Sequence, residues 1–541
     1  KACGSLRDLE RGQKFHADII RDGTFGGHIF VGNALVDMYA KCGALGNARE
    51  VFDELCLRDV SSWNVMISAY AQYEHAYHSG DDEAALNCFY RMQSEGFAAD
   101  LITFVGILKA CGGSRRIQQG QEIHARFVVD RLMEKHISAG NALVDMYAKC
   151  GMISEAQRIF DGLSVRDLIS WNVLIGAYVQ QGYGKEAIRI FERMQWEGYT
   201  PDAITFISAL KACGIVGAVD KGQEMQAEIM KQGWINKHAL VGNALADMFS
   251  KSGAIQKAQE VFDELPSRNV ASWNTLISGY LQHDNAERAL HCFEEMRSAG
   301  FSPDIVTFVC ILKVCAKVGA MEKGQWVHAE IVSEGLFPHI LVGRELVDMY
   351  AKCGSITEAQ EVFDELALQD VVSWNSLLAG YAQLGKDSSV FELFNKMTMH
   401  GIYPDFITFL IVLYACNHLG LLLNGQVYFN TMSRDYGIIP TLQHYNCMID
   451  LFARAGHFDR VMVIIEQMPF SANLIVWHAV LSGCQKRDNE KLGRLAFEHA
   501  LQIDGMDRAA YLILSNIYIC SKLCVQEDAE NSDANYQREG G

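Results

Sequence analysis

The sequence predicts an all-α fold, a right-handed α-solenoid superhelix built from stacked helical hairpins. The first observation is a long internal period: the phrase GNALVDMY and its variants recur with steps of 108, 102, 101 and 102 residues, from Asn33 to Asn446. The second is that each step contains three related segments of about 35 residues, each with the pattern of two helices. A hairpin of this size cannot bury its apolar face alone, so neighbouring copies must stack.

The segment 168–202 illustrates the pattern of one repeat. Its first predicted helix is WNVLIGAYVQQ, and Gly182 is placed to end it because glycine adopts the left-handed cap at little cost. The second is KEAIRIFERMQWEG, with apolar residues at helical spacing. Gly198, Pro201 and Asp202 then form the turn to the next repeat. All seven prolines fall at such joints, and none interrupts a predicted helix.

The segment SWNVLIGAYVQQGYGKEAIRIFERMQWEGYTPD resembles a pentatricopeptide repeat. The alternation of 35-, 36- and 31-residue repeats resembles the P, L and S motifs of the plant organellar PLS subfamily, from Lys1 to about Cys520. Residues 474–507 resemble the first E motif of editing-class members. The related tetratricopeptide repeat has a uniform 34-residue period that this chain lacks.

We divide the chain on this basis. S repeats occupy 29–59, 137–167, 239–269, 340–370 and 442–473; P repeats occupy 60–100, 168–202, 270–304 and 371–405; L repeats occupy 101–136, 203–238, 305–339 and 406–441, after a truncated L repeat at 1–28. The E-like motif spans 474–507, and a decayed second E motif with a polar tail spans 508–541. The P repeat at 60–100 carries an insertion around YEHAYHSGDD.

The composition excludes several classes of protein. A formal net charge of −18 argues against a general nucleic-acid binder. No uncharged apolar run reaches the roughly 18 residues of a membrane helix, so no membrane partner is expected. The 16 cysteines form no C-x-x-C pair, so we expect buried thiols in a reducing compartment and no metal ligands. The chain begins inside a recurring phrase and without methionine, so we expect a fragment that lacks any targeting peptide.

No catalytic site is predicted either. A zinc deaminase needs an H-x-E motif with a partnered C-x-x-C. The one matching phrase, His328 to Glu330, has counterparts at His16 and His124 and is therefore a repeat position. We expect no catalytic residue, no cofactor and no metal.

Each P repeat places an asparagine directly after a tryptophan on an otherwise apolar helix. Helix capping is one explanation. However, serine stands two positions earlier in P repeats (Ser62, Ser170, Ser272, Ser373) and threonine in L repeats (Thr103, Thr205, Thr307, Thr408), and these hydroxyls are the better cap candidates. L repeats keep the helix without asparagine, so we expect an outward amide that can donate and accept hydrogen bonds. In S repeats, where glycine precedes the asparagine, capping stays open.

In the family, the fifth and last residues of a repeat select one base of single-stranded RNA. Asparagine with aspartate implies uracil, and two asparagines imply a pyrimidine. The resemblance implies these pairs: Asn33 with Asp59, Asn64 with Asp100, Asn141 with Asp167, Asn172 with Asp202, Asn243 with Asn269, Asn274 with Asp304, Arg344 with Asp370, Asn375 with Asp405, and Asn446 with Asn473. Arg344 departs from the pattern and L repeats are poorly coded. The implied site is 5′-UUnUUnYUnnUnY-3′, separated by three unread bases from an edited cytidine.

Two further sets complete the implied interface. The second residue of a repeat acts in the family as a wedge between bases, a role that falls here on Phe30, Ile102, Ile169, Ile204, Leu240, Val306, Leu341, Val372 and Ile407. S repeats also carry a basic residue two helical turns beyond the asparagine slot: Lys41, Lys149, Lys251, Lys352 and Arg454. These are candidate phosphate contacts, with ordinary solvated side chains as the alternative. The terminal aspartates also suit helix capping, which is compatible with base selection.

The resemblance implies a sequence-specific RNA-binding protein of the mitochondrion or chloroplast, with the mitochondrion preferred. We expect it to select sites for C-to-U editing, with a deaminase supplied in trans or by a missing C-terminal domain. The alternatives are a transcript stability or processing factor and a protein-binding helical scaffold. The recurring asparagine–aspartate slots disfavour the scaffold, because peptide binding does not require them.

Overall fold

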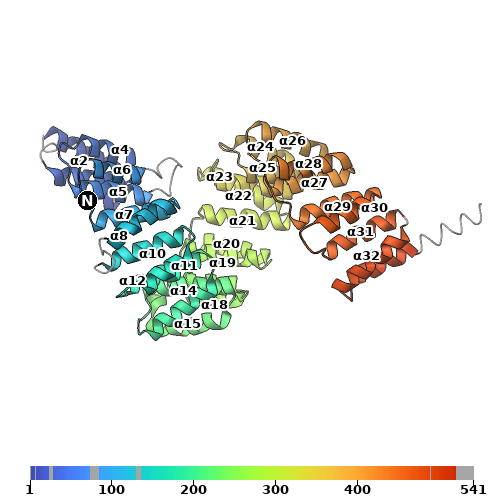
Figure 1. The fold of residues 1–541 in the computed structure, drawn as a ribbon, viewed down its shortest axis with the longest axis horizontal. Helices are drawn as coiled ribbons and strands as arrows, with labels where there is room; N and C mark the ends of the chain where they lie inside the picture. Colours follow the sequence, from blue (N-terminus) through green and yellow to red (C-terminus); the bar gives the residue numbers. More distant parts are fainter. Residues whose placement is uncertain are drawn as a thin grey trace, which may run out of the picture. The chain divides into compact units, whose positions relative to one another are not determined.

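The computed structural model describes residues 2–6, 8–22, 28–73, 84–129, 136–487 and 489–518. The described residues form helices and connecting turns with no strand (Figure 1). They divide into two compact blocks, the N-terminal block of residues 1–283 and the C-terminal block of residues 284–541. Most of the predicted insertion around YEHAYHSGDD and the polar tail after residue 518 lie outside the described residues.

In the N-terminal block, each repeat contributes a first and a second helix. The first helices are α3 (Ile29–Lys41), α5 (Val60–Tyr73), α7 (Leu101–Gly113), α10 (Ile137–Lys149), α12 (Leu168–Gln180), α14 (Ala203–Val216), α17 (Ala239–Lys251) and α19 (Val270–Gln282). The second helices are α4 (Leu45–Glu54), α6 (Ala84–Ser94), α8 (Ile117–Val129), α11 (Ile153–Asp161), α13 (Gly184–Trp196), α15 (Val219–Gln232) and α18 (Ile255–Glu264). Helix α2 (Leu9–Arg21) and the short helices α1 (Ala2–Leu6) and α16 (Trp234–Lys237) complete the block.

The C-terminal block repeats this arrangement. Its first helices are α21 (Ile305–Val318), α23 (Ile340–Lys352), α25 (Val371–Gln383), α27 (Phe406–Leu419), α29 (Leu442–Ala455) and α31 (Leu474–Lys486). Its second helices are α20 (Ala286–Ser298), α22 (Met321–Ser333), α24 (Ile356–Glu365), α26 (Asp387–Met399), α28 (Leu422–Arg434), α30 (Phe458–Gln467) and α32 (Glu490–Ile503). The predicted fold class, an all-α solenoid of stacked hairpins, is confirmed.

Within each block, the first helix of a repeat packs against the first helix of the next repeat and against its own second helix, so the first helices form one continuous layer (Figure 1). Tryptophan of the P repeats joins neighbouring repeats. Trp171 on α12 is fully buried and meets Phe160 on α11 edge-on at 4.8 Å between ring centroids. The same pair recurs as Trp63 with Phe52 at 4.7 Å. Truncating such a residue costs about 3–5 kcal/mol of stability, so this tryptophan is a structural residue.

The helix starts differ from the sequence prediction. The serine and threonine hydroxyls are not the N-caps of the P and L repeats; the last residue of the preceding repeat is. Asp167 has extended backbone (φ −118°, ψ 177°), and its carboxylate accepts from the backbone N–H of Ser170. Ser170 already lies in the helix, and its hydroxyl accepts in return from the backbone N–H of Asp167. Both residue types cap well, but only the aspartate lies before the helical backbone begins.

Asparagine at the last position also caps: the side chain of Asn269 caps α19 and that of Asn473 caps α31. In S repeats, capping by the fifth-residue asparagine is excluded, because α10 already begins at Ile137, four residues before Asn141. Gly182 has φ +79° and follows α12, as predicted. All seven prolines lie outside helices. The cysteines at one shared slot of the L repeats, Cys111, Cys213, Cys315 and Cys416, are buried.

Candidate nucleic-acid interface

One predicted base-selecting pair of the N-terminal block is joined by direct hydrogen bonds. The amide nitrogen Nδ2 of Asn64, on α5, donates to the two carboxylate oxygens of Asp100 at 3.0 and 3.1 Å. The hydroxyl of Thr103, on α7 of the next repeat, donates to Oδ1 of Asn64 at 2.6 Å. The amide is therefore held at both ends, by the last residue of its own repeat and by the following repeat.

The same three-residue arrangement recurs in both blocks. Nδ2 of Asn172 lies 3.1 Å from Oδ1 of Asp202, and the hydroxyl of Thr205 lies 2.6 Å from Oδ1 of Asn172. In the C-terminal block, the corresponding distances from Asn375 are 3.0 Å to Asp405 and 2.7 Å to Thr408. We call each such set a P-repeat triad. The predicted pair Asn274 and Asp304 belongs to two different blocks.

S repeats bring their predicted pairs together more loosely. Nδ2 of Asn141 is 3.4 Å from Oδ1 of Asp167, and Nδ2 of Asn243 is 3.5 Å from Oδ1 of Asn269. Within the described residues, the Oδ1 atoms of Asn33, Asn141, Asn243 and Asn446 are buried and accept no hydrogen bond. Ser170, the third residue of the P repeat that follows Asn141, does not contact it, and its hydroxyl lies 2.7 Å from Asp167.

The asparagine side chains are less exposed than the sequence prediction of an outward amide required. Asn64 and Asn375 keep only 6% and 7% of their surface exposed, and Asn172 is half-buried. An RNA base would therefore meet the edge of an amide that is already hydrogen-bonded. The direction in which that amide points is set by the protein before any ligand arrives.

The carboxylates of two triads, Asp100 and Asp202, are stabilised in their ionised form. Burial raises the pKa of Asp202, but hydrogen bonds from the backbone N–H and hydroxyl of Thr205 and from the Asn172 amide outweigh it and hold the pKa below its usual value. Asp100 follows the same pattern: burial raises its pKa, and hydrogen bonds from Thr103 and Asn64 outweigh burial and hold the pKa below its usual value. At neutral pH both side chains are acceptors only.

All the predicted wedge residues are exposed apolar side chains. Their exposed fractions range from 87% for Phe30 to 40% for Leu341, a list completed by Ile102, Ile169, Ile204, Leu240, Val306, Val372 and Ile407. Each stands at the second position of a first helix, three residues before the asparagine slot. The exposed side chains therefore recur at one slot of successive repeats.

A surface hollow of about 430 Å³ brings several predicted residues together. Its lining includes Lys41 from an S repeat, Asn64 and Asp100 from the next P repeat, and Ile102 from the L repeat that follows. A second hollow of about 440 Å³, in the C-terminal block, is lined in part by Gln383 and Asn446. A candidate phosphate contact, a base-selecting pair and a wedge thus share one surface.

The predicted phosphate contacts are all paired with a carboxylate one helical turn earlier. The Nζ of Lys149 lies 2.9 Å from Asp145. The other pairs are Lys41 with Asp37, Lys251 with Asp247, and Lys352 with Asp348, each at 2.7 Å, and Arg454 with Asp450 at 2.8 Å. The positive charge at this slot is therefore largely neutralised within the protein.

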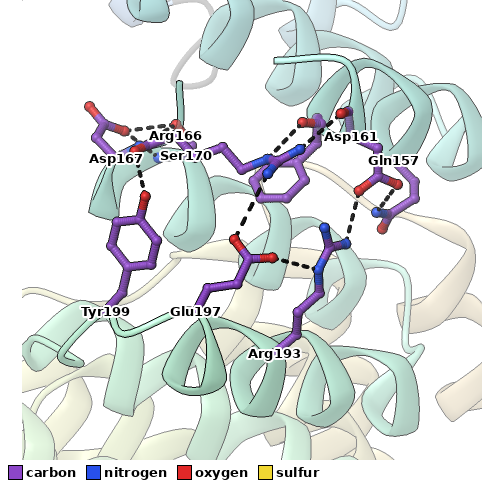
Figure 2. Close-up of polar contacts among 9 residues, drawn as sticks. Gln157, Asp161, Arg166, Asp167, Ser170, Arg193, Glu197 and Tyr199 are labelled. Atoms are coloured by element: carbon purple, nitrogen blue, oxygen red, sulfur yellow. Dashed lines mark hydrogen bonds and ion pairs between the residues drawn. The ribbon is translucent and has the colours of Figure 1, made fainter. Parts of the chain in front are cut away.

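Two arginines near the boundary between the S repeat 137–167 and the P repeat 168–202 also form ion pairs and hydrogen bonds within the protein (Figure 2). Arg193 on α13 contacts Asp161 and Glu197, each at 2.9 Å. Arg166 donates to the backbone carbonyls of Phe160 and Asp161 at the end of α11. Tyr199 donates its hydroxyl to the carbonyl of Arg166 at 2.9 Å. This network lies beside Asp167 in Figure 2 and anchors the backbone that presents that carboxylate.

His328 and Glu330 each contact a residue of the helical stack. Nδ1 of His328 is hydrogen-bonded to the hydroxyl of Tyr350 at 2.9 Å, and Glu330 pairs with Arg297 at 3.1 Å. Nowhere in the described residues do three or more His, Cys, Asp or Glu side chains gather in a way that could hold a metal ion. In the same part of the chain, no helix is long and apolar enough to cross a membrane.

Sequence reasoning missed the part played by Thr103, Thr205 and Thr408 as partners of the preceding asparagine. The signal was present, because L repeats carry threonine where P repeats carry serine. From the sequence alone, the two residue types are equivalent cap candidates. Only the structure shows that the threonine hydroxyl also contacts the asparagine of the neighbouring repeat.

The sequence profile described as PPR repeat family matches residues 166–214, 268–317 and 369–418, and the profile described as PPR repeat matches 33–60, 141–167, 243–270, 346–369 and 443–471. A mitochondrial pentatricopeptide repeat-containing protein of Arabidopsis thaliana is 32% identical over 520 residues, which cover 96% of this chain and 74% of that protein. The chain belongs to the pentatricopeptide repeat family.

Other members cover this pentatricopeptide repeat chain equally well. The Arabidopsis thaliana protein DOT4, chloroplastic, is 37% identical over 522 residues, covering 96% of this chain and 59% of DOT4. The chain spans about three fifths of the length of several such curated relatives, 61% in one case and 59% in another. The crystal structure of PPR10 from maize matches with a TM-score of 0.52 at 19% identity, covering 93% of this chain and 83% of PPR10. A second structure, of PPR10 with an 18-nt psaJ RNA element, matches with a TM-score of 0.51 at 18% identity, covering 91% and 82%. These two matches show a shared fold.

Proposed function

We propose that this chain binds single-stranded RNA in a mitochondrion or chloroplast and selects its target through one base per P or S repeat. The observation that carries the proposal is the recurring triad beside an exposed apolar side chain. In the hollow near α5, Asn64 and Asp100 present hydrogen-bonding groups next to Ile102. Polar groups of this kind suit a base edge, and the apolar side chain suits a base face.

The charge distribution supports base contacts as the main source of affinity. The chain carries a net charge of −18, and its lysines at the phosphate slot are paired with aspartates. Attraction to a phosphate backbone, which would favour any RNA, is therefore weak. Hydrogen bonds and stacking repeated along many repeats favour the matching sequence. We propose that the phosphate contacts at Lys41, Lys149, Lys251, Lys352 and Arg454 act only after the ion pair to the neighbouring carboxylate opens.

The names of the relatives and of the matched complex support this assignment. Arabidopsis relatives are designated mitochondrial or chloroplastic. The maize protein PPR10, whose fold this chain shares, was crystallised with an RNA element. Two-helix repeats alone are compatible with protein binding, but the triads at the fifth and last positions favour RNA.

We further propose a role in choosing sites for C-to-U editing, with the deaminase supplied by another protein or domain. The alternation of S, P and L repeats and the E-like segment 474–507 support this finer assignment. In the C-terminal block, the E-like helices α31 and α32 continue the stack, because α31 packs on α29 of the last S repeat. An extra hairpin in this position is suited to hold a partner beside the end of the bound RNA.

Binding to 5′-UUnUUnYUnnUnY-3′ compared with a scrambled strand tests the proposal. The matched strand is expected to bind more tightly, and equal affinity for both strands would overturn sequence-specific binding. The variant Asn172→Thr, with Asp202 retained, is expected to move the preference at the fifth base from uracil to guanine. An editing assay with a deaminase added in trans tests the finer role. Editing is expected at a cytidine beyond three unread bases and is expected to be lost when that spacing changes by one.

A further inference from the structure

The asparagines of P and S repeats occupy the same slot but have different surroundings. In the P repeat at 168–202, the amide of Asn172 has a partner at each end, Asp202 and Thr205. In the S repeat at 137–167, Asn141 has one long bond of 3.4 Å to Asp167, and its Oδ1 has no partner among the described residues. The two repeats carry the same asparagine–aspartate pair, so the difference comes from the repeat that follows.

The residue that differs is the third residue of the following repeat. Thr205 places its hydroxyl 2.6 Å from Oδ1 of Asn172 and 2.8 Å from Oδ1 of Asp202. Ser170, at the same slot, places its hydroxyl 2.7 Å from Asp167. Threonine is branched at Cβ and has fewer rotamers open to it than serine. Its hydroxyl is therefore more firmly directed.

Fixing the amide at both ends determines which of its hydrogen-bonding groups faces a base. A primary amide has two N–H donors at one end and a carbonyl acceptor at the other, and a half-turn exchanges the ends. In the triad, a carboxylate that only accepts holds Nδ2, and the threonine hydroxyl, whose one hydrogen lies between Oδ1 of the asparagine at 2.6 Å and Oδ1 of the aspartate at 2.8 Å, contacts the carbonyl end. The second N–H of Nδ2 is the donor left to offer, and Oδ1 keeps one of its two lone pairs. A donor suits the carbonyl at position 4 of uracil and opposes the amino group at position 4 of cytosine.

We propose that Thr103, Thr205 and Thr408 are positioning residues that sharpen uracil selection by the asparagine of the preceding P repeat. These three L repeats, although poorly coded for a base of their own, then contribute to the base of the preceding P repeat. S repeats lack this contact, so their asparagines discriminate uracil from cytosine less strongly. The inference rests on the proposed binding of RNA by these repeats.

The test is the ratio of affinities for strands with uracil or cytosine at one base. Asn172 reads the fifth base, and Thr205→Val removes the hydroxyl with little change in shape. This variant is expected to lower the uracil-to-cytosine ratio at the fifth base about fivefold, the size of one neutral hydrogen bond. The ratio at the eleventh base, read by Asn375, is expected to stay unchanged. Thr205→Ser keeps a hydroxyl and is expected to recover much of the ratio.

Ser170→Ala is the matched control. Ser170 and Thr205 both accept from the backbone N–H of the capping aspartate, at 3.2 Å in each case. Only Thr205 contacts an asparagine, so Ser170→Ala removes only the hydroxyl's bonds to the capping aspartate. It is expected to leave the ratio at the fourth base, read by Asn141, unchanged. An equal loss in the two variants would assign the effect to capping and overturn the inference.

The remaining outcomes separate the inference from the proposed function. If wild-type protein prefers the matched strand but Thr205→Val keeps the wild-type ratio, the inference fails and sequence-specific binding stands. If wild-type protein shows no base preference at all, both fail. If Thr205→Val does not fold, Thr408→Val in the C-terminal block gives the same comparison at the eleventh base. Wild-type protein provides a test without any variant. Replacing uracil with cytosine is expected to reduce RNA affinity more at the fifth base than at the fourth. An equal reduction at the two bases overturns the inference.

Discussion

Nδ1 of His124 and the hydroxyl of Tyr147 share a hydrogen bond of 2.9 Å that joins the second helix of an L repeat to the first helix of the next S repeat. The same bond joins His16 to Tyr39 and His328 to Tyr350, at 2.9 Å each. The corresponding slots elsewhere hold Gln226 with Phe249 and Phe429 with Phe452. Where the tyrosine hydroxyl is missing, the histidine is missing too. The histidine and the tyrosine therefore occur together or not at all at these slots.

These histidines make the stability of the stack dependent on pH. Burial lowers the pKa of His16, His124 and His328, so the folded protein favours their neutral form. The unfolded chain binds protons at higher pH, near the ordinary histidine pKa of about 6.5. Stability from these sites is therefore complete above that value and is lost as pH falls through the lowered pKa. We expect the free energy of unfolding, measured by urea denaturation, to decrease between pH 7.5 and pH 5.

A double variant provides the control for this pH dependence. His328→Gln with Tyr350→Phe copies the natural pair at Gln226 and Phe249. It is expected to lose about 0.5–1.5 kcal/mol at neutral pH, the value of one hydrogen bond, and to show a smaller loss on acidification. An unchanged pH dependence after replacement of the corresponding pairs would assign the effect to other groups.

The order of the helices and the exposed wedge residues could be predicted from the sequence because both follow local spacing. Ile169 is exposed and Trp171 is buried two residues later, as the repeated phrase suggests. The first residue of the helix could not be predicted from the sequence, because Asp167 and Ser170, three residues apart, are both residue types that cap helices well. The partner of Asn172 could not be predicted either. Thr205 lies in the next repeat, and its contact depends on how the two first helices pack.

Two glycines on the first helices of P repeats are expected to respond to substitution in opposite ways. A Cβ at Gly176 on α12 meets nothing within 4 Å, whereas a Cβ at Gly380 on α25 lies 2.7 Å from Cβ of Ala351. Gly176→Ala is expected to stabilise the protein by about 0.5–1 kcal/mol through reduced chain entropy. Gly380→Ala is expected to destabilise it by about 1–3 kcal/mol, because α23 must move. Denaturation midpoints check both, and a stabilising Gly380→Ala would contradict the close packing of α23 and α25.

Releasing a lysine from its ion pair is expected to increase RNA binding in general. Asp145→Asn removes the partner of Lys149, and the exposed ion pair contributes little to stability. The freed ammonium is expected to raise affinity for matched and scrambled strands alike. It is also expected to steepen the dependence of log K on log salt by up to about 0.7, the value for one phosphate of a single strand.

Asp220→Asn is the control for net charge. It changes the total charge by the same amount at an exposed carboxylate on the second helix α15. Its salt dependence is expected to stay close to that of the wild type. If the two variants behave alike, Lys149 does not face the RNA and the phosphate assignment at this slot fails.

Arg344 is the position at which a single substitution should create a base preference. It occupies the asparagine slot of an S repeat, contacts Asp370 at 3.3 Å, and keeps a buried Nε with no partner among the described residues. Arg344→Asn restores an asparagine–aspartate pair, so we expect uracil to become preferred at the tenth base. The next repeat supplies Ser373 and no threonine, so this preference should be weaker than that at the fifth base. Arg344→Ala removes the guanidinium without adding an amide and should show no preference at that base. Affinities for four strands that differ only at the tenth base decide the matter, and equal affinities of Arg344→Asn for all four would contradict base selection by this slot.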